Sequence, residues 1–88
     1  MNDRIPDDLE IAKQELALCK QQDRLLEKIE IRLHAMKKIA QYASEHELTR
    51  VERTQQNKEL EEHQSIIKGL EQEYGELLKQ WRNDLPLQ

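Results

Sequence analysis

Residues 44–52 read Ser-Glu-His-Glu-Leu-Thr-Arg-Val-Glu and contain two overlapping helix-capping patterns. In each pattern a hydroxyl residue stands three positions before a glutamate, Ser44 before Glu47 and Thr49 before Glu52. The hydroxyl and the carboxylate of such a capping box bind the free amide groups at the start of a helix. The pattern therefore predicts a turn at about residues 44–48, with Thr49 as the N-cap of a second helix.

The sequence on both sides of this turn is typical of long helices. Of its 88 residues 36% are charged, 3% are aromatic and only two are glycine, a composition that favours helix over a mixed fold. The two prolines, Pro6 and Pro86, stand near the ends of the chain, where they interrupt no helix interior. We expect one all-α domain over residues 1–88, an antiparallel, coiled-coil-like hairpin with helices at about 7–43 and 49–84. One continuous helix is the alternative, because neither glycine nor proline enforces the turn.

Apolar residues at steps of three and four predict how the two helices pack. Folding the chain about the turn brings Leu16 opposite Leu77 and Leu33 opposite Leu60, so that apolar residues face each other. The predicted intramolecular seam consists of Leu16, Cys19, Leu26, Leu33, Leu60, His63, Ile67, Leu70, Tyr74, Leu77 and Trp81.

The first helix carries a second apolar stripe, formed by Ile11, Leu18, Leu25 and Ile39 and interrupted by Arg32. One antiparallel helix cannot cover both stripes. Single exposed apolar side chains are common on protein surfaces, but a repeat every seven residues favours an interface. We predict that these four apolar residues bind either a second copy or another protein. Either partner would complete a four-helix bundle.

Lys20, Arg24, Lys28 and Arg32 recur every four residues and form a basic ridge on the first helix. Such a ridge is a possible site for an anionic partner, including nucleic acid. The net charge of −4 and the lack of interleaved aromatic residues argue against nucleic acid. We expect the ridge to pair with acidic residues of the second helix, with Arg32 near Glu61.

Two Glu-His pairs at four-residue spacing, Glu30 with His34 and Glu59 with His63, could suggest a metal site between the helices. The di-iron bundles instead use Glu-x-x-His spacing and six converging ligands. We therefore expect no metal and no cofactor, but a polar contact between Glu30 and His63 that fixes the register.

The sequence contains no glycine-rich phosphate loop, nucleophile elbow or Ser/His/Asp arrangement, so we expect no enzyme. It contains no apolar run near the ~18 residues of a membrane span and no secretory signal, so we expect a cytoplasmic protein. The predicted function is that of a protein–protein interaction module, a small regulator, adaptor or chaperone-like hairpin that forms a dimer of hairpins or binds another protein. A purely structural self-assembling coiled-coil subunit and a nucleic-acid accessory protein are the alternatives.

Overall fold

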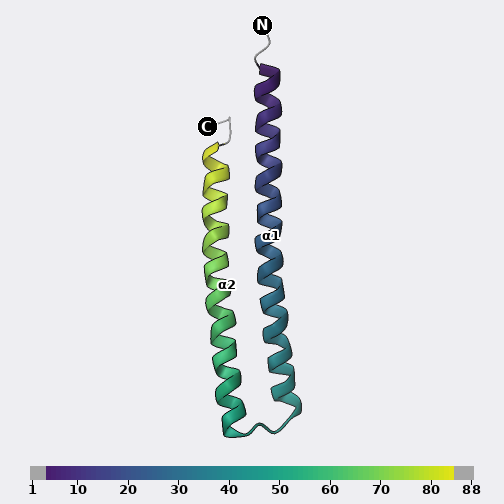
Figure 1. The fold of residues 1–88 in the computed structure, drawn as a ribbon, viewed down its shortest axis with the longest axis vertical. Helices are drawn as coiled ribbons and strands as arrows, with labels where there is room; N and C mark the ends of the chain where they lie inside the picture. Colours follow the sequence, from purple (N-terminus) through teal and green to yellow (C-terminus); the bar gives the residue numbers. More distant parts are fainter. Residues whose placement is uncertain (1–3, 85–88) are drawn as a thin grey trace.

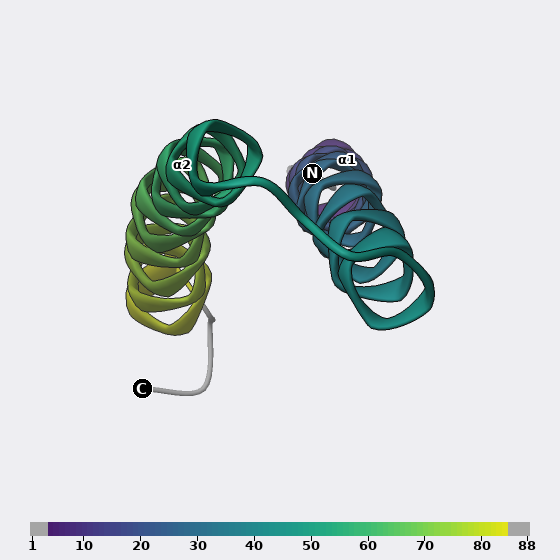
Figure 2. The same ribbon diagram turned by 90° about the horizontal axis from the view of Figure 1, so that it is seen from below.

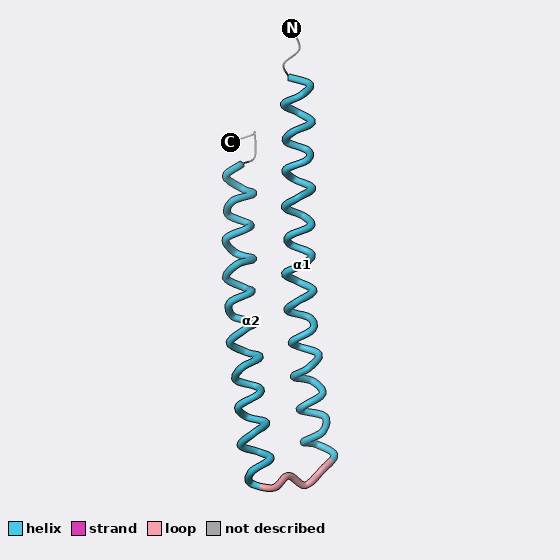
Figure 3. Tube along the Cα trace, in the orientation of Figure 1, coloured by secondary structure: helices cyan, strands magenta, loops and turns pink. Residues whose placement is uncertain are grey.

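The computed structural model describes residues 4–84 and shows two long antiparallel helices joined by a short loop (Figures 1 and 3). Helix α1 spans Arg4–Glu45 and helix α2 spans Arg50–Asp84, and the described residues contain no strand. The hairpin measures 74 × 17 × 14 Å. The predicted all-α hairpin is confirmed. Helix α1 begins earlier than predicted and includes Pro6 in its first turn, a position that tolerates proline. Pro86 lies outside the described residues.

The start of α2 is fixed by a complete capping box. The amide of Thr49 donates to Oε1 of Glu52 at 3.1 Å, and the amide of Glu52 donates to the Thr49 hydroxyl oxygen, also at 3.1 Å. The backbone amide of Arg53 then donates to the Thr49 carbonyl at 3.0 Å and closes the first helical turn. The prediction of Thr49 as the N-cap is confirmed, because both reciprocal bonds of the box are present.

The other capping pattern does not start a helix. Ser44 lies in the last turn of α1, where its hydroxyl donates to the Gln41 carbonyl at 2.8 Å. Two donors of His46, its backbone amide and its ring Nδ1, reach the Tyr42 carbonyl at 3.1 and 2.9 Å. The His46 ring also stacks on the Tyr42 ring, with 4.0 Å between centroids. This arrangement satisfies a free carbonyl at the end of α1 without the glycine that commonly ends a helix.

The face of α2 that packs against α1 is the predicted one. Leu70 and Leu77 are buried and form the core together with two leucines of α1. Tyr74 and Trp81 pack against this cluster. The remaining members of the predicted α2 seam are partly buried: Leu60, His63 and Ile67.

The face of α1 that packs against α2 differs from the prediction. Among the α1 side chains that the structure describes, the buried ones are Leu18 and Leu25, which the sequence analysis assigned to an external interface. Ile11 and Ile39 of the same predicted interface are partly buried. The four α1 residues predicted for the seam are instead exposed to solvent: Leu16, Cys19, Leu26 and Leu33. The prediction was therefore wrong about which of the two stripes of α1 faces α2.

The regularity of the heptad repeat explains this choice. The packed face of α1 follows an unbroken four-three pattern in which large apolar residues predominate, and such a pattern keeps a face directed at a neighbouring helix. The predicted seam instead used Leu26 and Leu33, which follow Leu25 and Arg32 of the packed face by one residue each. Ile29 and Met36 are partly buried, whereas Leu26 and Leu33 are exposed.

The register of the hairpin also differs from the prediction. Nη1 of Arg32 lies 3.4 Å from Nδ1 of His63 in the partly buried seam. The sequence analysis predicted that Arg32 lies near Glu61 and that His63 contacts Glu30. In the structure Glu30 is exposed. The observed contact is offset by two residues from the predicted one, because the seam uses the other face of α1.

Candidate protein interface on α1

A stripe of exposed apolar side chains runs along α1 beside the helix–helix seam. Four leucines of this stripe, which we call the outer stripe, expose 47–56% of their surface. Ala12 and Cys19 lie between them on the same face, as do the carboxylates of Asp23 and Glu30, and all four are exposed. The outer stripe consists of Leu9, Ala12, Leu16, Cys19, Leu26 and Leu33.

The outer stripe and the seam of α1 are separated by a rotation about the helix axis. Leu25 exposes 9% of its surface, whereas the next residue, Leu26, exposes 47%. Successive residues of an α-helix are rotated by about 100°, so the outer stripe points away from α2 at nearly a right angle. That angle is close to the one between two neighbours of a helix in a four-helix bundle. The outer stripe is therefore oriented so that a further helix could pack there without displacing α2.

The charges beside the outer stripe change sign along α1. Asp8 lies on this face at the start of the helix and Lys37 lies on it in the last third, and both side chains are exposed. One end of this surface is therefore acidic and the other basic, which favours a partner with the opposite polarity.

The basic ridge lies on the other side of the seam and faces acidic residues of α2. Arg24 and Lys28 line a groove of about 360 Å³ together with Glu73 and Glu76. Lys20 is exposed, and Arg32 is partly buried against His63. The acidic side chains of α2 therefore reduce the positive potential of the ridge.

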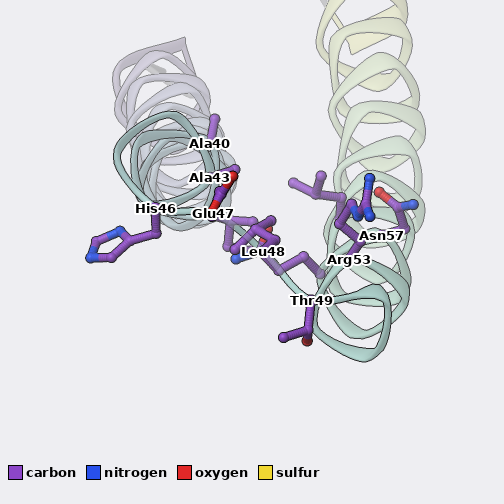
Figure 4. Close-up of a pocket in the computed structure, with 11 residues that line it drawn as sticks. Ala40, Ala43, His46, Glu47, Leu48, Thr49, Arg53 and Asn57 are labelled. Carbon is purple, nitrogen blue, oxygen red and sulfur yellow. The ribbon is translucent and has the colours of Figure 1, made fainter.

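A second groove, of about 750 Å³, lies between the helices at the turn (Figure 4). On α1 it is lined by Ile39, Ala40 and Ala43, and on α2 by Arg53, Gln56, Asn57 and Leu60. Leu48 extends from the loop between the two helix ends, and the loop bridges their separation (Figures 2 and 4). The two alanines and the polar side chains of α2 do not fill the space between the helices at this end, so the groove stays open.

The possible metal ligands and the titratable groups of the described residues were compared with what a metal site or a catalytic site requires. No group of three or more His, Cys, Asp or Glu side chains within the described part of the chain could hold a metal ion. The pKa of Glu52 is lowered, first by the hydrogen bond that its carboxylate accepts from the Thr49 amide and then by the Thr49 side chain. This shift reflects the helix cap and therefore has a structural explanation. Between residues 4 and 84 neither helix has a stretch long and apolar enough to cross a bilayer.

No family model, curated protein or solved structure matches this chain.

The function is therefore inferred from the hairpin's own surface. The sequence correctly indicated that α1 carries more apolar surface than α2 can cover, but it named the wrong stripe as external. Leu18 and Leu25 belong to the core, and Leu16 and Leu26 take their place on the surface. Leu9, seven residues before Leu16 on the same face, belongs with them, although it was not among the predicted site residues.

Proposed function

We propose that this protein is a non-enzymatic interaction module, a small regulator, adaptor or chaperone-like hairpin that binds another protein chain through the outer stripe of α1. The observation that supports the proposal most directly is the series of half-exposed leucines along one face of α1 at Leu9, Leu16, Leu26 and Leu33. Burial of such side chains contributes about 25 cal/mol per Å² of apolar surface, so they favour association. A helix packed on this stripe, from a second hairpin or from another protein, would complete a four-helix arrangement.

The small core of the hairpin supports the same proposal. Among the described side chains only four are buried, Leu18, Leu25, Leu70 and Leu77, and each still exposes 8–9% of its surface. A chain of this size buries a small fraction of its surface and gains little stability from its own core. A partner on the outer stripe would therefore add to the stability of the fold as well as to its function.

Of the two other functions considered, only the second fits the surface less well. A purely structural self-assembling subunit would use the same outer stripe and would differ only in having no other partner. A nucleic-acid accessory protein would depend on the basic ridge, yet Arg24 and Lys28 share a groove with Glu73 and Glu76. These carboxylates would repel a phosphate backbone, and the net charge of −4 adds to that repulsion. We propose the cytoplasm as the compartment, where an exposed thiol such as that of Cys19 stays reduced.

Site-specific photo-crosslinking in the native cell tests the interface. A photoreactive amino acid replaces Leu26 of the outer stripe in one protein and Val51, which exposes 77% of its surface on α2, in a control. We expect a discrete crosslinked product from position 26 that is absent from position 51, and mass spectrometry identifies the chain that it contains. Equal or no crosslinking at the two positions contradicts the proposal, because both side chains are accessible and only position 26 would face a partner.

A further inference from the structure

The exposed leucines of the outer stripe have a spacing that is identical in both chain directions. Leu9 and Leu16 are seven residues apart, as are Leu26 and Leu33, and ten residues separate the inner two. A two-fold symmetric dimer buries the same patch on both subunits, so the patch must be complementary to itself. When two α1 helices lie antiparallel with their Gln21 residues side by side, Leu16 lies opposite Leu26 and Leu9 opposite Leu33. Every exposed leucine of the stripe then meets a leucine.

The smaller residues of the stripe fit the same alignment. In this alignment Glu30 and Asp23, which interrupt the stripe, lie opposite Ala12 and Cys19 of the second copy, two side chains that take up little space. Their size lets the two helix backbones approach, so that each leucine can reach its counterpart. From Leu9 to Leu33 the contact would be about 36 Å long at 1.5 Å per residue. The α2 helices would lie outside this contact, because the outer stripe is rotated by about 100° from the seam.

The charge distribution selects the antiparallel over the parallel arrangement. In the antiparallel dimer, the acidic start of one α1 lies beside the basic last third of the other. Asp8 then comes within about one helical turn of Lys37 on the second copy, and opposite charges meet at both ends. A parallel dimer would place Asp8 beside Asp8 and Lys37 beside Lys37, and the stripe carboxylates Asp23 and Glu30 opposite their own copies. Like charges at both ends would weaken that dimer.

We infer that the outer stripe binds a second copy of this chain, with the two α1 helices antiparallel and paired about Gln21. The inference rests on the proposed function, because it names the partner of the same surface. Two hairpins joined in this way form a four-helix assembly with the α1 helices at its centre. Any different protein that binds the stripe must then displace the second copy.

Sedimentation velocity tests whether the dimer forms. At concentrations on the order of 10–100 µM we expect the wild type to sediment as a dimer. The double variant Leu16→Asp/Leu26→Asp should be a monomer with unchanged helicity by circular dichroism, because both positions are exposed in the single hairpin. In a dimer the introduced carboxylates would face each other across the symmetry axis. The control variant Val51→Asp, on the exposed surface of α2, should sediment as the wild type does.

Disulfide trapping tests the orientation. In the antiparallel alignment Cys19 of one copy lies opposite Asp23 of the other, whereas in a parallel dimer each position meets itself. Equal amounts of the wild type and of the Cys19→Ser/Asp23→Cys variant are mixed and gently oxidised. We expect mainly mixed dimers that join the native Cys19 to the cysteine at position 23, a pairing that mass spectrometry identifies. Predominance of the two like-with-like disulfides would overturn the antiparallel arrangement.

The two experiments separate this inference from the proposed function. A wild type that stays monomeric at 100 µM overturns self-pairing. If position 26 nevertheless crosslinks to a different protein in the cell, the proposed function stands and only its partner changes. If position 26 crosslinks to nothing, both proposals fail.

Discussion

Arg32 and His63 meet across the seam of the hairpin, with 3.4 Å between Nη1 of the guanidinium and Nδ1 of the imidazole. Both residues occupy positions where the neighbouring heptads of the seam carry apolar side chains, Leu25 on α1 and Leu70 on α2. A polar pair at such positions specifies the register of two helices and lowers the stability of the packed state. The contact therefore fixes how α2 is aligned with α1.

Replacing this pair with leucine should stabilise the hairpin. In the double variant Arg32→Leu/His63→Leu, the apolar seam continues past Leu25 and Leu70, and two partly desolvated polar groups are removed. We expect the free energy of unfolding to rise by about 2 kcal/mol, a shift on the order of 10 °C in melting temperature. Thermal denaturation followed by circular dichroism measures the effect, with Lys20→Leu on the exposed ridge as a control. A lower melting temperature would show that the polar contact stabilises the fold more than leucine packing does.

Two adjacent leucines should respond differently to the same substitution. Leu25→Ala removes a core side chain and should lower the free energy of unfolding by about 2 kcal/mol, near the low end for buried leucines because the core is open on its sides. Leu26→Ala removes an exposed side chain and should change it by less than about 0.5 kcal/mol. Urea denaturation measures both, at a concentration low enough to keep the hairpin monomeric. A larger loss for Leu26→Ala than for Leu25→Ala would contradict the observed rotation of α1.

The contrast between these residues shows how far the sequence predicts the fold. Helix α2 has one apolar stripe, so the pattern from Leu60 to Trp81 identified its packed face correctly. Helix α1 has two stripes that begin one residue apart, with Leu18 and Leu25 on one and Cys19 and Leu26 on the other. Each stripe is amphipathic by itself, and only packing against a particular face of α2 distinguishes them. The choice depends on the heptad phase and the side-chain size along the whole contact, which local spacing does not reveal.

Local hydrogen bonding, in contrast, was predictable. The Thr49–Glu52 cap depends on four consecutive residues, so the sequence alone located the start of α2. The existence of an uncovered apolar surface on α1 was also predictable. Helix α1 has two apolar stripes and α2 can cover only one of them, whichever one that is. The identity of the residues on that surface was not predictable, since the error about Leu18 and Leu25 carried over directly into the predicted interface.

The capping box should contribute measurable stability. Thr49→Ala removes the hydroxyl that accepts the Glu52 amide at 3.1 Å. We expect a loss of about 1 kcal/mol, the typical effect of removing an N-cap side chain. Thr54→Ala is a matched control, because that hydroxyl donates to the Arg50 carbonyl inside the helix at 3.0 Å and satisfies no free amide. Similar melting temperatures for the two variants would show that the cap does not stabilise the hairpin.

Replacing the two glycines of α2 with alanine should make the hairpin more stable. A Cβ atom built at Gly69 or at Gly75 would meet no other atom within 4 Å, and neither residue has a positive φ. Alanine at each position should therefore stabilise the helix by about 0.5–1 kcal/mol without steric strain. Thermal denaturation of the single and double variants measures the gain. A destabilising effect of Gly69→Ala would indicate that a partner approaches this exposed position closely in solution.

Acidification should weaken the start of α2 through Glu52. Its pKa lies below the ordinary value of 4.5, chiefly because its carboxylate accepts the Thr49 amide and secondly because of the Thr49 side chain. Partial burial raises this pKa, and the nearby charge of His46 lowers it. A carboxyl group whose pKa is lowered by folding stabilises the folded state above its unfolded pKa. That contribution is lost as the pH falls through the folded pKa, and the affected range therefore lies below about 4.5.

The variant Glu52→Gln isolates this contribution from the other carboxylates of the chain. Glutamine keeps an oxygen that can accept the Thr49 amide but does not titrate. We expect the wild type to melt at a higher temperature than the variant from pH 7 down to about pH 5, and this difference to shrink as the pH falls further. The remaining carboxylates titrate in both proteins, so their effects cancel in the difference. A difference that stays constant from pH 7 to pH 3 would show that the charge of Glu52 does not stabilise the cap.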